Sequence, residues 1–156
     1  MALLNIIKEG DDVLRKKSRR VEEITPRIIT LLDDMKATLA FSGGMGLAAP
    51  QVGVLRRIFI VDTGEEIIEL INPEIIHAEG EQEGPEACLS IPGKWGLVKR
   101  PMDVTVKGRD RHGNIKTYKG NELVARCFCH EYDHLEGVLY PDIAEKMLDP
   151  EEIEQQ

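Results

Sequence analysis

Two histidines four residues apart have the spacing to hold a metal ion between them. They occur in His130-Glu131-Tyr132-Asp133-His134, an HExxH pattern in a chain of 156 residues. Residues four apart on a helix lie roughly 6 Å apart along the axis and about 40° apart around it, so both imidazoles can reach one ion. Glu131 lies about 100° around the helix from His130 and can take a proton from metal-bound water. The pattern predicts a metal-dependent hydrolase.

A catalytic metal site needs a third protein ligand and an open position. Cys88 is the candidate, because prolines and a glycine bound its segment, which could approach the helix. Cys127 is the rival, but from there a thiol would have to reach past His130 to a metal also held by His134. We interpret Cys127 as a buried wall of the site. Cys129 is expected to point elsewhere on the helix.

The apolar pattern predicts the elements that position these residues. Helical spacing predicts helices over 25–41 and 121–135, and a short acidic helix is expected after Asp142. Strands are predicted over 57–62, 67–71, 74–79, 104–109 and 115–119, with Asn72-Pro73 dividing the second from the third. The uncharged, glycine-rich stretch 43–53 is either a loop or a tightly packed segment. The order predicts an α+β fold with an N-terminal helix, a central block of mostly antiparallel strands, and a C-terminal helix carrying the metal motif.

Composition narrows the functional classes. A chain of this length is expected to form one domain over residues 1–156. The net charge of −8 argues against direct, nonspecific nucleic-acid binding. No stretch approaches the ~20 apolar residues that span a membrane, and the amino terminus lacks a signal-peptide pattern. Three cysteines are expected to be reduced thiols. A cytoplasmic protein is therefore expected.

Three segments together resemble the three motifs of the peptide deformylase family. They are Gly44-Met45-Gly46-Leu47-Ala48-Ala49-Pro50-Gln51, Glu86-Ala87-Cys88-Leu89-Ser90 and His130-Glu131-Tyr132-Asp133-His134. Their order and spacing also match, and the likeness extends over nearly the whole chain. The resemblance implies a bacterial enzyme that removes the formyl group from the formyl-methionine of newly made polypeptides and releases formate.

The resemblance also implies roles for individual residues. Cys88, His130 and His134 would hold one divalent metal, with water in the fourth position. Glu131 would act as general base and then as general acid. In the family, the residue matching Gln51 and the backbone N–H of Leu89 bind the developing oxyanion, and such donors are typically worth a few kcal/mol each in the transition state.

Other residues are expected to bind substrate or support the ligands. Gly44 and Gly46 would let a peptide backbone approach closely. A pocket for a methionine side chain is expected to be lined by Met45, Leu89, Leu123 and Cys127. Glu86 is expected to bond a ligating histidine or pair with Arg100, and Asp133 to pair with a basic residue behind the site. Both carboxylates could equally be solvated. His77 and His112 are given no ligand role.

The chain departs from the family pattern at two positions. Ala87 stands where the family usually has glycine, which would add strain if the position required a positive φ. Cys129 stands where the family usually has glutamine, so hydrogen bonds behind the site would be lost. Neither change touches a proposed ligand, so activity is expected to survive. Longer family members carry a basic tail thought to dock on the ribosome, whereas residues 149–154 here are acidic, so ribosome docking is not carried over.

The metal and the reaction leave alternatives open. A Cys-His-His site with an open position suits Fe²⁺, expected first from the family, but also Zn²⁺, Co²⁺ or Ni²⁺. A metallopeptidase would share the helix motif, although such enzymes usually take their third ligand from downstream of the helix. A non-catalytic protein with a closed structural site is the other alternative, with Cys127 as the fourth ligand.

Overall fold

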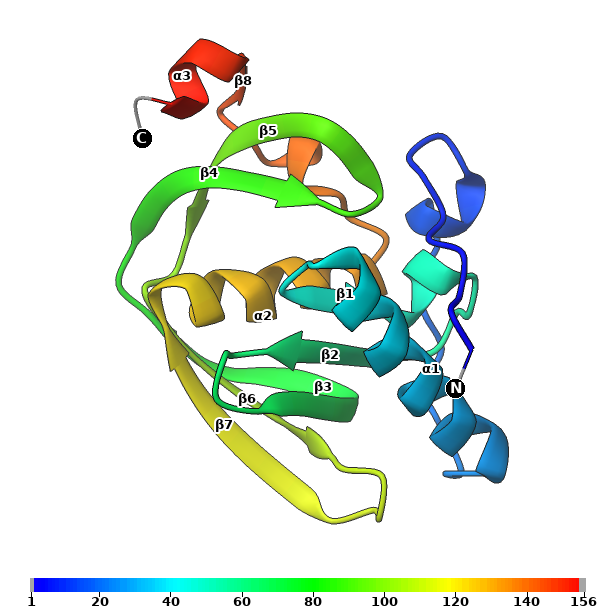
Figure 1. The fold of residues 1–156 in the computed structure, drawn as a ribbon. Coiled ribbons are helices and arrows are strands. Elements are labelled where there is room, and N and C mark those ends of the chain that lie inside the picture. Colours follow the sequence, from blue (N-terminus) through cyan, green and yellow to red (C-terminus); the bar gives the residue numbers. More distant parts are fainter. Residues whose placement is uncertain (1, 155–156) are drawn as a thin grey trace.

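The computed structural model describes residues 2–154 and places the helix α2 between two antiparallel sheets (Figure 1). The helices are α1 (Pro26–Ser42), α2 (Glu122–Leu135) and α3 (Pro150–Glu154). Short 3₁₀ turns are η1 (Asp12–Arg15), η2 (Ala49–Val52) and η3 (Tyr140–Asp142). None of the helices described is long and apolar enough to cross a membrane. The α+β class predicted from the sequence is confirmed, with the metal motif on α2.

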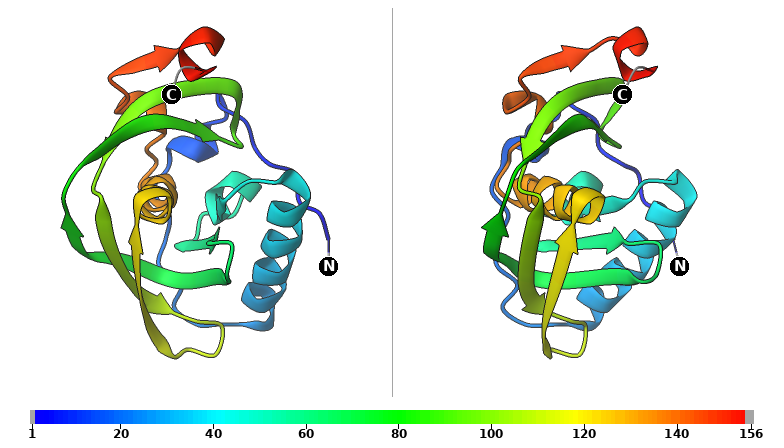
Figure 2. Two further views of the ribbon diagram at one scale, coloured as in Figure 1. Left: turned by 60° about the vertical axis from the view of Figure 1, so that its left-hand side comes forward. Right: turned by 90° about the vertical axis from the view of Figure 1, so that its left-hand side faces the viewer.

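The larger sheet has five strands in the order β1-β2-β3-β6-β7. They are β1 (Gly46–Ala48), β2 (Ile58–Asp62), β3 (Ile67–Glu79), β6 (Asp103–Arg109) and β7 (Ile115–Asn121). The smaller sheet is ordered β4-β5-β8, with β4 (Gln82–Cys88), β5 (Ile91–Arg100) and β8 (Lys146–Leu148). Figure 2 shows the β4–β5 hairpin arching over one side of α2 while the larger sheet curves under the other. The helix is therefore held from both sides.

Strand β2 is buried on both faces, which explains its continuous apolar run. Phe59 and Val61 pack in a cluster with the buried residues of α2. Ile58 and Ile60 point the opposite way, into a cluster with Leu32 and other residues of α1. Because successive side chains of a strand point to opposite faces, a strand covered by a helix on each side needs apolar residues throughout. The two predicted helices thus meet opposite faces of one strand.

Helix α1 begins and ends where its capping residues predict. The Thr25 hydroxyl accepts a hydrogen bond from the Ile28 backbone N–H at 3.4 Å, and Pro26 occupies the first turn. Gly43 closes the helix with φ 76°, a left-handed conformation that favours glycine. The glycine-rich segment that follows is tightly packed: it forms β1 and η2, and residues 47–51 are buried.

The structure corrects two of the predicted elements and adds a hairpin that was not predicted. The division at Asn72-Pro73 was wrong, because β3 continues through it with a shift in register. Asn72 takes φ 53° there, and its amide exchanges hydrogen bonds of 2.8 and 2.9 Å with the Val21 backbone, which stabilise the irregularity. Residues after Asp142 form β8 before the short helix α3. The β4–β5 hairpin was not predicted, since its glycines and prolines obscure the strand pattern.

Tyr140 has a buried hydroxyl with no hydrogen-bond partner among the described residues. Its ring stacks near that of His130, with centroids 6.2 Å apart. Leaving a buried donor unsatisfied costs roughly 1–3 kcal/mol. We expect Tyr140→Phe to leave the free energy of unfolding unchanged or to raise it by about 1 kcal/mol, measured by urea denaturation. Tyr140→Ala, which removes the ring, is the contrasting variant and should cost about 3–5 kcal/mol. A Tyr140→Phe loss as large as that would contradict the prediction.

Candidate metal centre and active site

Three side chains from two elements converge beside α2. Cys88 ends strand β4, and His130 and His134 lie one turn apart on the helix. The Sγ of Cys88 lies 3.3 Å from Nε2 of His134, which lies 3.3 Å from Nε2 of His130. All three ligand atoms are within 4.8 Å of one another. Ligands about 2.0–2.3 Å from a tetrahedral centre lie roughly 3.3–3.8 Å apart, so the donor set fits a divalent metal.

Glu86 orients the first histidine. Its Oε1 accepts a hydrogen bond of 2.5 Å from Nδ1 of His130, which directs Nε2 of the ring towards Cys88 and His134. Arg100 pairs with the same carboxylate at 2.6 Å and with Asp133 at 2.7 Å. Burial opposes the charge on Glu86, but the hydrogen bonds from His130 and Arg100 outweigh it and lower the pKa of Glu86 to about 2. The carboxylate is therefore charged, and both pairings considered for Glu86 occur.

Burial affects the two histidines unequally. It lowers the pKa of His134 well below the usual value, which favours the neutral imidazole that a metal requires. Burial acts on His130 in the same direction, but its hydrogen bonds with Cys88 and Glu86 outweigh this and raise its pKa. These two bonds attract a proton when no cation is bound. A divalent ion at the same point would supply the positive charge instead.

Glu131 faces the centre without joining the ligand group. Its Oε1 is buried and has no hydrogen-bond partner among the described residues. Burial raises the pKa of Glu131 to about 7. A carboxyl group with a pKa near neutrality can both accept and return a proton, which is what a general base that later acts as an acid must do.

Gln51 reaches the centre from η2. Its Oε1 accepts a hydrogen bond of 2.9 Å from the Ala48 backbone N–H, which fixes the orientation of the amide. Its Nε2 donates to the Ser90 hydroxyl at 3.1 Å and lies 3.6 Å from the Cys88 sulfur. The amide N–H group is thus held beside the ligands. Leu89 and Ser90 form the two-residue turn that joins Cys88 to its partner Ile91.

A pocket of 420 Å³ opens onto the centre. It is lined by the predicted substrate residues Gly44, Met45, Gly46, Leu123 and Cys127, together with Gln51, Leu89, Glu131 and the candidate ligands Cys88 and His130. Leu123 is 67% exposed and lies at the rim. Trp95 and Arg126 also line the pocket and were not predicted. Arg126 is four residues before His130, so its position on the motif face of the helix was the available signal.

The other cysteines lie outside the ligand group. Among residues 2–154, the group of ligand atoms close enough to share an ion contains Cys88, His130 and His134 but neither Cys127 nor Cys129. Burial raises the pKa of Cys127 well above the usual value, and Glu131 adds to the effect. Burial raises the pKa of Cys129 to about 11. Both thiols are therefore neutral, in keeping with the predicted wall position of Cys127.

Ala87 does not strain the β4 strand. Among the described residues other than glycine, only Asn72 and Glu122 have a positive φ. The departure from the family's usual glycine at position 87 thus has no backbone cost of the kind considered from the sequence.

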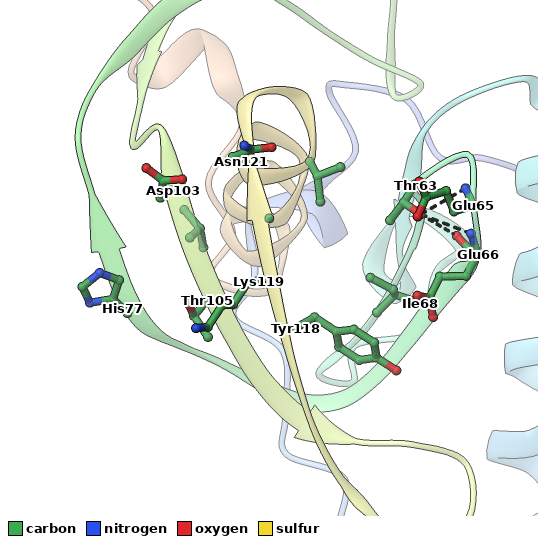
Figure 3. Close-up of a pocket in the computed structure, with 13 residues that line it drawn as sticks. Thr63, Glu65, Glu66, Ile68, His77, Asp103, Thr105, Tyr118, Lys119 and Asn121 are labelled. Carbon is green, nitrogen blue, oxygen red and sulfur yellow. Dashed lines mark hydrogen bonds between the residues drawn. The ribbon is translucent and has the colours of Figure 1, made fainter.

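A second pocket, of 550 Å³, lies away from the ligands (Figure 3). It is lined by polar residues of β3, β6 and β7, among them His77, Asp103 and Lys119. His77 is exposed, and its Nε2 lies 2.9 Å from the Glu79 carboxylate. The described residues place no three metal-binding side chains together there. Although this pocket is larger, the convergence of candidate ligands, carboxylate and amide makes the 420 Å³ pocket the candidate functional site.

Close approach makes a glycine necessary at position 46. A Cβ built on Gly46 would lie 2.6 Å from both the Cys127 sulfur and Oε2 of Glu131. Gly46→Ala should therefore displace Glu131 and lower kcat, by about 10-fold or more if the carboxylate moves by an ångström. Gly44→Ala is the contrasting variant: its Cβ would lie 2.8 Å from the flexible end of Leu89 and away from Glu131, so it should raise KM more than it lowers kcat. Equal turnover of the two variants in a steady-state assay would contradict this.

The fold and this site define a class of protein, a hydrolase that works with a divalent metal. The chain matches the family model for polypeptide deformylase over residues 3–149. It is 56% identical over 154 residues to a peptide deformylase from Caldanaerobacter subterraneus subsp. tengcongensis, covering 99% of this chain and 97% of that one. It is 54% identical over 155 residues to a peptide deformylase from Thermoanaerobacter pseudethanolicus, covering 99% and 98%. The chain belongs to the polypeptide deformylase family.

Solved structures of peptide deformylases have the same fold as this chain. A peptide deformylase from Legionella pneumophila superposes with a TM-score of 0.89 at 39% identity, covering 99% of this chain and 90% of that one. One from Synechococcus elongatus, in complex with actinonin, superposes with a TM-score of 0.88 at 37% identity, covering 97% and 82%. The fold, the enzyme class and the binding of a divalent metal expected from the resemblance are thereby confirmed.

Proposed function

We propose that residues 1–156 form a single catalytic domain in which Cys88, His130 and His134 hold one divalent metal for deformylation. The observation that carries the proposal is the convergence of these three ligand atoms within 4.8 Å, at a pocket that also holds Glu131. When bound, the metal lowers the pKa of a coordinated water and polarises the formyl oxygen. Among the candidate ions, Fe²⁺ is proposed for the cell, with Zn²⁺, Co²⁺ or Ni²⁺ as substitutes.

The side chains divide the hydrolysis between them. Glu131 takes the proton of the attacking water, whose oxygen bonds to the formyl carbon. Charge that develops on the formyl oxygen is met by the Gln51 amide and the Leu89 backbone N–H. Glu131 then returns the proton to the peptide nitrogen as the carbon–nitrogen bond breaks, which releases formate and a free amino terminus. One water is consumed: one of its protons reaches the peptide nitrogen through Glu131, and the other stays on the new carboxyl group and is lost when formic acid ionises to formate.

The pocket supplies selectivity for the first residue. Met45, Leu123 and Cys127 offer apolar and sulfur surface to a methionine side chain, while Gly44 and Gly46 leave room for the peptide backbone. The partner is a formyl-methionyl nascent peptide in the bacterial cytoplasm. Residues 149–154 are mainly acidic, so no docking on ribosomal RNA through this segment is proposed.

Formate release from a formyl-Met peptide tests the proposal. The enzyme, purified without air and with its metal content measured, should cleave the formyl peptide and leave its acetylated twin intact. Equal cleavage of both, or scission within the peptide, would favour a metallopeptidase. The closed structural site is tested separately by X-ray absorption at the metal edge, where one sulfur and an oxygen are expected and two sulfurs would indicate Cys127 as a ligand.

A further inference from the structure

Arg126 is a buried arginine of α2 that neither binds the metal nor belongs to the three family motifs. It is 7% exposed and lies four residues before His130, so the two side chains occupy one side of the helix. Its Nη1 donates to Oε2 of Glu86 at 2.8 Å and to the Val98 carbonyl at 3.1 Å. Both partners belong to the β4–β5 hairpin. One guanidinium nitrogen therefore joins the helix to both strands of the hairpin.

The metal site depends on the position of that hairpin. Its cysteine ligand is on β4, whereas both histidine ligands are on α2. Glu86 is two residues before Cys88 on β4 and also accepts the hydrogen bond from His130. Because a metal tolerates little error in ligand distance, a shift of the hairpin along the helix would separate the thiolate from the imidazoles.

Two bridges flank His130 and hold the hairpin against the helix. On one side of His130, Arg126 of α2 pairs with Glu86 of β4. On the other side, Arg100 of β5 pairs with Asp133 of α2. The Arg100 bridge is the more exposed one, since the Asp133 side chain is 25% exposed. Both arginines contact Glu86, so a carboxylate that is 4% exposed is neutralised from the helix and from the hairpin.

We propose that Arg126 is a positioning residue that ties α2 to the β4–β5 hairpin and so sets the spacing between the cysteine and histidine ligands. The inference rests on the proposed metal site, and its effect reaches the metal through Glu86 and His130. Arg126→Met removes every donor while keeping an unbranched apolar side chain in place of the arginine stem. Arg126→Lys keeps the charge but lacks the planar fork that fixes both bonds at once.

Metal affinity is the primary measurement, because it does not require turnover. Zn²⁺ dissociation constants, from competition with a chelator, should be about 10- to 100-fold weaker for Arg126→Met and intermediate for Arg126→Lys. The visible spectrum of the Co²⁺ form should change in Arg126→Met, since it reports ligand geometry. In the loaded enzyme, kcat should fall more than KM rises. Unchanged Zn²⁺ affinity and Co²⁺ spectrum in folded Arg126→Met would overturn the proposal.

Two comparisons make the outcome specific. Arg111→Met is the control, because Arg111 also bridges two carboxylates, Glu69 and Asp33, but does so away from the site, and it should bind metal normally. In a double-mutant cycle, Arg126→Met and Glu86→Gln should weaken Zn²⁺ binding non-additively, because one acts through the other. Additive effects would contradict the route through Glu86. If Arg126→Met does not fold, unchanged Zn²⁺ affinity of Arg126→Lys overturns the proposal.

Failure of this inference can be told from failure of the proposed function. A parent protein that binds no divalent metal would contradict the metal site itself. A parent that binds metal and deformylates, beside an Arg126→Met variant with the same Zn²⁺ affinity, would contradict only the role of Arg126.

Discussion

Replacing Glu131 with glutamine is expected to lower kcat by about 10²- to 10⁴-fold while the metal stays bound. The change keeps the size of the side chain and removes its ability to take a proton. Oε1 of Glu131 has no protein partner among the described residues, so no structural hydrogen bond is lost with it. Because Glu131 is outside the ligand group, the loss should fall on proton transfer rather than on metal binding.

The measurement is formate release under saturating substrate, beside metal content by elemental analysis. Glu122→Gln is the matched control: it removes the same charge from the exposed first turn of the same helix and should turn over normally. Near-normal turnover of Glu131→Gln would show that the proton is carried by another group. Loss of metal in that variant would instead show that Glu131 supports the ligands.

Replacing Cys88 with alanine is expected to remove the metal, and with it the activity. Two histidines would remain, and a catalytic site of this kind needs three protein ligands. The Cys88 side chain lies in a small apolar cluster with Ile91 and Val98, where alanine leaves only a small void. The fold should therefore survive, and the purified variant should contain far less than one metal per chain.

The other two thiols are controls for that result. Cys127→Ala and Cys129→Ala remove the same atoms from the same neighbourhood, but neither sulfur belongs to the ligand group. Both variants should keep about one metal per chain, measured by elemental analysis after purification without air. Metal loss in Cys127→Ala matching that in Cys88→Ala would favour the closed structural site over the catalytic one.

The HExxH helix shows how far local sequence can predict a site. His130, Glu131 and His134 are related by helical geometry alone, so their spacing determines that the two rings share a face and that the carboxylate lies beside them. The caps of α1 and the burial of β2 are similarly local, because they depend on neighbouring residues and on a short apolar run. Cys88 was the candidate third ligand because of its proline- and glycine-bounded segment, and the resemblance to the deformylases, now confirmed, added Gln51 as a partner for the helix.

Local sequence patterns could not predict the shift in register within β3 or the β4–β5 hairpin over α2. Asn72 looked like a strand end, but its side chain bonds to the Val21 backbone, 51 residues away, and β3 continues. The β4–β5 hairpin contains glycines that obscure its pattern, yet one of them, Gly96, is required because a Cβ would lie 2.8 Å from the Tyr140 ring. Such contacts join distant parts of the chain, and no window of sequence contains both partners.

The sequence by itself determined which chemistry this centre can perform. The residue types of the candidate ligands, and the helical spacing of the two histidines, depend on the local sequence alone. Only the tertiary structure decided how that chemistry is held together. It brought Cys88 to the histidines, gave Glu86 three cationic or hydrogen-bonding partners, and placed Arg126 between helix and hairpin. The physical reason is that a buried carboxylate such as Glu86 must be paired with a cation. Its pairing with Arg126, 40 residues away, depends on how strand β4 packs against helix α2.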